Sequence, residues 1–145
     1  MINMGDYMQK IVLDRSILSK GLAKNCLKSK EDEIIIHNSI IYSINFLLNR
    51  NKITANIALL ELEHLCKNCF NLKFLGEVIR IKDEEQLVDI DHKILDYAYE
   101  NEALYYTSDE RLFRLAKVKG ISANFFPAEI NTEIIGRFFL QDVMS

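Results

Sequence analysis

Five short runs of apolar, β-branched or aromatic residues alternate with helix-like segments along this chain. The predicted strands span residues 10–13, 33–36, 77–81, 103–106 and 121–126. The segments between them repeat apolar residues three and four positions apart, as amphipathic helices do. Strands that alternate with helices favour right-handed crossovers and a mostly parallel sheet that is covered on both faces. We therefore expect an α/β protein with three layers, α/β/α, and a central sheet of about five strands.

A single domain spanning residues 1–145 is the simplest organisation. The chain has one proline, five glycines and no low-complexity linker. We expect its core over residues 9–126 and a helical extension over residues 127–145 that packs back onto the sheet. No apolar run is long enough to cross a bilayer, and the N-terminus lacks the apolar stretch of a secretory signal. We therefore predict a cytoplasmic protein without a membrane partner.

Charge and cysteine content disfavour two classes of function, bulk nucleic-acid binding and structural zinc binding. The chain carries 18 basic and 21 acidic residues, a formal net charge of −3. This balance disfavours bulk electrostatic binding to nucleic acid but permits a local basic rim. A structural zinc site needs a full set of ligands, which the scattered cysteines and histidines do not form. Cys66 and Cys69 follow the leucine stripe of a predicted helix, so we expect both to pack in the core.

Three aspartates occupy positions where α/β proteins build their sites. Asp14 and Asp109 follow the ends of the first and fourth predicted strands, and Asp91 stands at the expected N-terminus of the fourth helix. These positions share one edge of a parallel sheet, so the three carboxylates should converge. Converging carboxylates repel unless a cation lies among them, and Mg²⁺ or Mn²⁺ is the natural partner. Such a metal activates water for phosphodiester hydrolysis. Alternatively each aspartate caps a helix, and the two roles are compatible.

The stretches around these aspartates resemble a known family. They read KIVLDRSIL, DHKILDYAYE and LYYTSDERLFRLAKVKGI. In this order they resemble the first, third and fourth acidic motifs of PIN domains, and the match covers residues 9–126. The resemblance implies a compact α/β/α fold and a metal-dependent ribonuclease that is often dimeric. Many members are the toxin half of a toxin–antitoxin pair, and others serve RNA processing and turnover.

The resemblance also implies roles for particular residues. Asp14, Asp91 and Asp109 take the positions of the catalytic acids that bind Mg²⁺ or Mn²⁺. Ser16 takes the small polar position that supports the first acid, and Thr107 takes the hydroxyl position beside the fourth.

Two features depart from the family pattern. Ser43 falls where the family has a glutamate after the second strand. Glu61 is the alternative fourth catalytic acid, but it lies about a quarter turn off the apolar stripe of its helix, so it could reach the site or face water. Arg15 replaces the common threonine after the first acid. Arg15 either contacts an RNA phosphate, with Arg111 as a second substrate contact, or marks a lost metal site.

Two functions follow from these residues. The first is a metal-dependent endoribonuclease that hydrolyses single-stranded or structured RNA; the resemblance further implies a homodimer and control by a protein inhibitor such as an antitoxin. The second is a PIN-like domain that has lost catalysis and binds protein or nucleic acid. The three aspartates favour the enzyme, whereas Ser43 and Arg15 favour the binding module.

Overall fold

A parallel sheet of five strands forms the centre of the structure. The computed structural model describes residues 8–128. The strands are β1 (Lys10–Leu13), β2 (Glu33–His37), β3 (Leu72–Leu75), β4 (Leu104–Thr107) and β5 (Ala123–Phe125). They pair in parallel throughout, in the order β3-β2-β1-β4-β5. The fold class predicted from the sequence is therefore confirmed.

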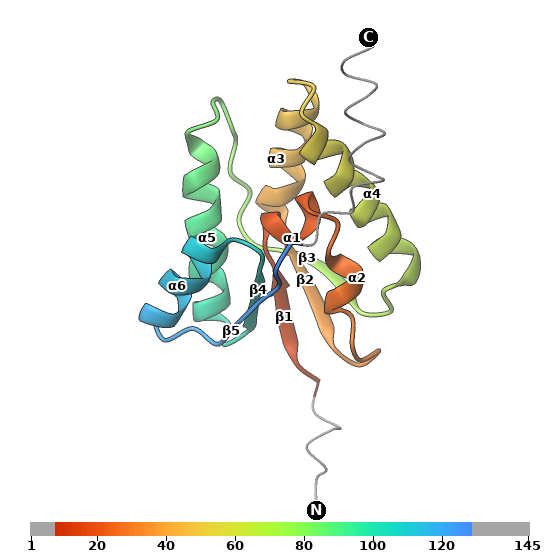
Figure 1. The fold of residues 1–145 in the computed structure, drawn as a ribbon, viewed down its shortest axis with the longest axis vertical. Helices are drawn as coiled ribbons and strands as arrows, with labels where there is room; N and C mark the ends of the chain where they lie inside the picture. The colour runs from red at the N-terminus through yellow and green to blue at the C-terminus, as the bar shows by residue number, and fades with distance from the viewer. Residues whose placement is uncertain (1–7, 129–145) are drawn as a thin grey trace, which may run out of the picture.

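Helices cover both faces of this sheet. They are α1 (Arg15–Ser19), α2 (Ala23–Cys26), α3 (Asn38–Leu48), α4 (Ile53–Asn68), α5 (Gln86–Glu100) and α6 (Glu110–Val118). The chain moves outward from β1 to β3 through the first four helices, then returns past β1 to β4 and β5 through α5 and α6. Because parallel crossovers are right-handed, reversing this direction places the later helices on the opposite face. Figure 1 accordingly shows α5 and α6 on one side of the sheet and α3 and α4 on the other.

The core follows the central strands. β1 and β2 read as continuous apolar runs because helices cover both of their faces. Tyr105 of β4 is also fully buried, which places its hydroxyl group inside the protein. No helix among residues 8–128 is both long and apolar enough to cross a membrane. The predicted C-terminal helical extension lies almost entirely outside the described residues.

The third strand differs from the prediction. It is Leu72–Leu75, and the predicted segment 77–81 has no regular structure. Gly76 ends the strand with a φ of +98°, a left-handed backbone conformation that favours glycine. Ile79 and Ile81 pack partly against the core from the following loop, and their alternation imitates a strand. β3 lies at the edge of the sheet and is mostly exposed, so it gives little apolar signal.

The cysteines divide between the core and the surface. Cys26 is buried, Cys69 is partly buried against the core, and Cys66 is exposed. The predicted core packing is therefore confirmed for Cys69 and wrong for Cys66. Leu65 is the last fully buried residue of α4, and the next residue turns about 100° away from the core.

This division should govern thiol reactivity. Burial raises the pKa of the Cys26 thiol to about 12, so almost none of it is thiolate at neutral pH. Under limiting iodoacetamide at neutral pH, Cys66 should be alkylated first and Cys26 only after unfolding. Peptide mapping by mass spectrometry would measure the order. Equal labelling of Cys26 and Cys66 in the folded protein would contradict the described core.

Candidate functional site

Asp14 lies where the chain leaves β1 and enters α1. Its Oδ1 accepts hydrogen bonds from the backbone N–H groups of Ser16 at 3.0 Å and Ile17 at 3.2 Å, so it caps the helix. The same oxygen accepts the Ser16 hydroxyl at 2.6 Å, and Oδ2 accepts the Tyr105 hydroxyl at 2.8 Å. The residue is only 1% exposed. Both carboxylate oxygens are therefore already bonded inside the protein.

Burial dominates the electrostatics of this carboxylate. It raises the pKa of Asp14, and the hydrogen bonds led by that of Ser16 offset only part of the effect. Burial and the nearby Asp14 charge also raise the pKa of Tyr105, so its hydroxyl keeps its proton and donates. Asp14 is thus a buried acid that accepts a hydrogen bond from the protonated Tyr105 hydroxyl.

A hydroxyl network joins the ends of β1 and β4. The backbone N–H of Ser108 donates to Ser16 Oγ at 2.7 Å, and the Ser16 and Thr107 hydroxyl oxygens are 3.3 Å apart. Thr107 Oγ1 in turn accepts the backbone N–H of Asp109 at 3.0 Å. Lys20 Nζ donates to the Ser108 carbonyl at 2.7 Å. Ser16 and Thr107 thus lie beside Asp14 and Asp109, the acids with which the family resemblance grouped them, and Lys20 joins the same network.

Asp109 caps α6. Its Oδ1 accepts the backbone N–H groups of Arg111 at 2.9 Å and Leu112 at 3.4 Å. The Arg111 guanidinium is 3.5 Å from Oδ2, and its side chain is 92% exposed. Arg111 is therefore a surface cation at the rim of the acidic edge, the region at the carboxyl ends of the strands that contains Asp14, Asp91 and Asp109.

Asp91 pairs with Arg15 across the edge. Arg15 Nε donates to Oδ1 at 3.0 Å, and Nη2 donates to Oδ2 at 2.9 Å. This two-pronged geometry is the strongest form of an arginine–carboxylate pair. The expected position of Asp91 at a helix N-terminus is wrong, because α5 begins at Gln86 and Asp91 lies more than one turn inside it.

The Arg15 guanidinium is a cation on which the charges of all three aspartates act. Burial opposes its charge, but the hydrogen bonds and charge of Asp91, with the charges of Asp14 and Asp109, outweigh that effect and raise the pKa of Arg15. The three aspartates that were predicted to converge therefore all favour the charged form of Arg15. Asp91 holds the guanidinium through hydrogen bonds, whereas Asp14 and Asp109 act on it through their charge.

This arrangement does not fit a divalent ion. Among residues 8–128, no three acidic, histidine or cysteine side chains are grouped closely enough to hold a metal. The oxygens of Asp14 and Asp91 and the Oδ1 of Asp109 already accept protein hydrogen bonds. A metal at Asp91 would have to compete with the Arg15 guanidinium for the same carboxylate.

Glu61, the alternative fourth acid, and Ser43 are both buried and hydrogen-bonded to backbone groups. Glu61 is 7% exposed and accepts the backbone N–H of Ala23 at 3.3 Å, so it meets the start of α2 and does not face water. Burial raises the pKa of Glu61. Ser43 is fully buried, and its hydroxyl donates to the Ile40 carbonyl at 2.6 Å. Ser43 brings no carboxylate to the site, and the role of Glu61 as a fourth acid stays a prediction.

The fold has a counterpart among solved structures. A domain of a functionally unknown protein from Methanocaldococcus jannaschii DSM 2661 is similar over 83% of this chain and 92% of its own, with 24% identity and a TM-score of 0.70. A PilT N-terminus domain protein from the hyperthermophilic archaeon Sulfolobus solfataricus P2 is similar over 90% of this chain and 93% of its own. That second likeness has 18% identity and a TM-score of 0.48. No protein-family model and no curated protein matches the sequence.

The Arg15–Asp91 pair should contribute measurably to stability. Arg15→Met would leave Asp91 without its partner, and we expect a loss of about 1–3 kcal/mol in the free energy of unfolding. Arg15→Lys, which keeps the charge but not the fork, should lose less. Arg114→Met breaks the exposed pair with Glu110 and should cost less than about 1 kcal/mol. Urea unfolding would measure all three, and an equal loss for Arg15→Met and Arg114→Met would contradict this assignment.

The raised pKa of Asp14 gives a pH dependence of definite sign. Its folded-state value exceeds the unfolded one, so its contribution to stability is complete below the unfolded-state pKa of about 4 and is lost as the pH rises through the folded-state pKa. Asp14→Asn should remove this loss, so the variant should gain stability relative to the wild type as the pH rises. Urea unfolding over a pH series would measure the gain.

The matched control is Asp89→Asn, since Asp89 is an exposed acid of α5. It should show no such pH-dependent gain. A constant difference between the wild type and Asp14→Asn at every pH would contradict the burial argument.

Proposed function

We propose that this chain is a PIN-like domain that works by binding a protein partner and not by metal-dependent cleavage of RNA. The observation that carries this proposal is the Arg15–Asp91 fork among the three aspartates. It favours the second of the two functions that follow from the sequence.

The chemistry of arginine supports this choice. A metal nuclease uses its ion to activate water and to neutralise charge on the phosphodiester. A guanidinium neutralises charge, but it stays protonated and holds no water as a ligand. Arg15 can therefore balance the aspartates without giving them the means to hydrolyse RNA. Ser43 is buried at the position where the family has a glutamate, so the site also lacks that metal ligand, which further disfavours metal-dependent hydrolysis.

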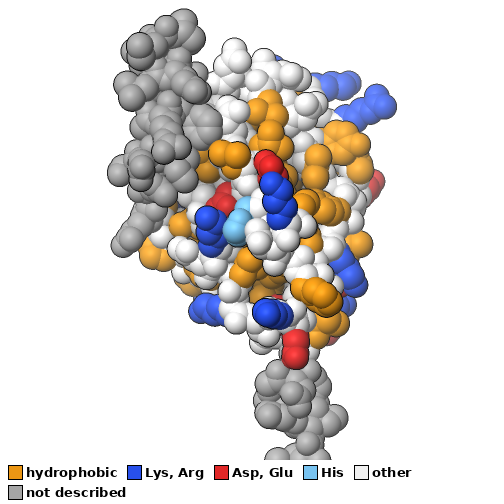
Figure 2. Space-filling view, turned by 90° about the vertical axis from the view of Figure 1, so that its right-hand side faces the viewer, with side chains coloured by type: hydrophobic (Ala, Val, Ile, Leu, Met, Phe, Trp, Pro, Cys, Tyr) orange, Lys and Arg blue, Asp and Glu red, His pale blue; other side chains and the backbone are white. Residues whose placement is uncertain are grey.

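The charges at this edge do not favour RNA. Arg15, Lys20 and Arg111 are matched by Asp14, Asp91 and Asp109, so the edge offers no net positive charge to a phosphate backbone. The face over α4 also mixes basic, acidic and apolar side chains, with no continuous basic surface on the part that the described residues form (Figure 2). An RNA partner thus lacks its usual electrostatic attraction here.

Exposed apolar side chains favour a protein partner instead. Phe70 is 92% exposed, and Phe74, Leu75 and Val78 are 37%, 37% and 47% exposed on β3 and beside it. β3 is also one of the two edge strands of the described sheet. Exposed apolar residues near an unpaired strand edge are typical of protein-binding surfaces. Either protein partner expected from the sequence, an inhibitor or a second copy of the chain, could use this surface.

Metal binding and RNA cleavage together test the proposal. The wild type should show no stoichiometric Mn²⁺ binding by calorimetry and no metal-dependent cleavage of a labelled single-stranded RNA. Arg15→Thr, which restores the residue common in the family, should bind Mn²⁺ measurably because the carboxylates lose their internal cation. Arg114→Thr makes the same change at an exposed position and should behave like the wild type.

Wild-type protein that binds Mn²⁺ and cleaves RNA, with both activities lost in Asp14→Asn, would establish the nuclease and overturn this proposal.

A further inference from the structure

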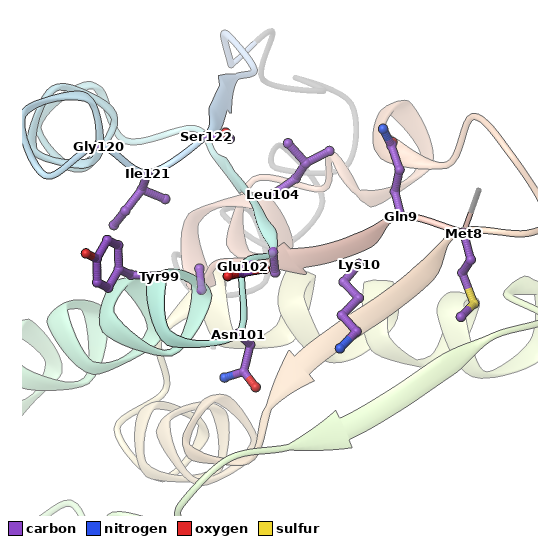
Figure 3. Close-up of a pocket in the computed structure, with 12 residues that line it drawn as sticks. Met8, Gln9, Lys10, Tyr99, Asn101, Glu102, Leu104, Gly120, Ile121 and Ser122 are labelled. Carbon is purple, nitrogen blue, oxygen red and sulfur yellow. The ribbon is translucent and has the colours of Figure 1, made fainter. Parts of the chain in front are cut away.

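A polar pocket at the carboxyl ends of β2 and β3 contains a buried histidine with one unused hydrogen bond. The pocket has a volume of about 300 Å³ and is bounded on its other side by α5. A larger cavity of about 600 Å³ lies near the starts of β1 and β4 (Figure 3). Its two charged lining residues, Lys10 and Glu102, are both exposed, so it offers no buried group for a ligand to satisfy. The smaller pocket is therefore the better candidate for a binding site.

The tautomer of His37 is fixed by its neighbour. The backbone N–H of Ser39 donates to His37 Nδ1 at 3.1 Å, and the Ser39 hydroxyl oxygen is 2.6 Å from the same atom. Because Nδ1 accepts a hydrogen bond, the neutral ring carries its proton on Nε2. Burial, with the charge of Lys93, lowers the pKa of His37, so the ring is neutral at physiological pH. The residue is 3% exposed.

The ring is also held in position from two sides. Gly76 lies against it, since a Cβ at that position would be 2.3 Å from Cδ2 and Nε2. The Asn38 side-chain amide donates to the Gly76 carbonyl at 2.8 Å and holds this turn in place. Tyr97 of α5 meets the ring edge to face, with ring centroids 5.4 Å apart. His37 is thus a rigid group, and only a glycine fits opposite it.

The remaining hydrogen-bonding capacity of His37 is its Nε2–H group. No group among residues 8–128 accepts a hydrogen bond from it, and His37 lines the pocket. A metal does not suit this atom, because Nε2 holds the proton while Nδ1 accepts from Ser39. The Nε2–H group of His37 is suited to donate a hydrogen bond to an oxygen of a ligand.

The surrounding charges define the rest of the ligand. Lys93 and Glu77 are close enough to shift the pKa of His37 in opposite directions, and both line the pocket. Glu100 adds a second carboxylate, whereas Asp96 is already paired with Lys119 at 3.3 Å. The pocket lining therefore brings one ammonium group, from Lys93, and two carboxylates, from Glu77 and Glu100, together with the histidine donor.

We propose that this pocket binds a small zwitterion that carries a carboxylate and an ammonium group, as a free amino acid does. The carboxylate accepts from His37 Nε2–H and faces Lys93, and the ammonium group faces Glu77 and Glu100. This proposal goes beyond the proposed function and does not depend on whether the acidic edge is catalytic.

Nuclear magnetic resonance on the ¹⁵N-labelled full chain tests it, with glycine, acetate and methylammonium as probes. Glycine should shift the His37 Nε2–H and Gly76 amide signals saturably. Acetate and methylammonium should each bind about tenfold more weakly, because each loses one charged contact. Lys93→Met should weaken glycine binding to a similar extent, whereas Lys67→Met, at an exposed position on α4, should leave it unchanged.

Three results would overturn the proposal. One is a proton on Nδ1 in the spectrum of the free protein. The second is the absence of saturable shifts with glycine in a protein whose other signals show that it is folded. The third is acetate binding as tight as glycine binding, because Glu77 and Glu100 would then have no part in recognition.

Discussion

The position of β1 at the centre of the sheet determines most of what lies around the acidic edge. β1 is paired on one side with β2 and on the other with β4. The pairing with β4 continues beyond the strand, because the backbone N–H of Asp14 donates to the Tyr106 carbonyl at 3.1 Å. The chain reverses its direction of travel across the sheet at this point, so the loops after β1 and β4 diverge to opposite faces and leave space between them. Asp14, Ser16 and Thr107 meet in that space.

The same geometry places three negatively charged side chains in one region, and a positively charged side chain of the same chain compensates them. Strand ends and helix starts provide backbone N–H groups that favour aspartates, and the fold gathers three of them in one region. Burying even one carboxylate without compensation is costly. Arg15 supplies the compensating charge because it is the first residue of α1, next to Asp14, and its side chain reaches Asp91 on the opposite layer. One arginine thus ties α1 to α5 across the sheet edge.

The sequence predicts the parts of this structure that depend on local pattern. The runs that became β1 and β2 are unmistakable because burial on both faces requires continuous apolar residues. The convergence of the aspartates follows from the shared edge of parallel strands. β3 escapes prediction because an exposed edge strand needs no apolar pattern. The Arg15–Asp91 pair escapes it because the two residues are 76 positions apart, and no local pattern links them. The fixed ring of His37 likewise depends on Gly76 and Tyr97, which lie on other elements.

The Arg15 guanidinium also differs from a bound ion in being part of the chain. An ion-neutralised edge gains or loses its compensating charge as the surrounding concentration changes. Here the compensating charge is synthesised with the polypeptide, in fixed proportion to the aspartates it faces. The charge that Arg15 itself contributes to this edge should therefore be the same in a chelating medium as in one rich in divalent ions.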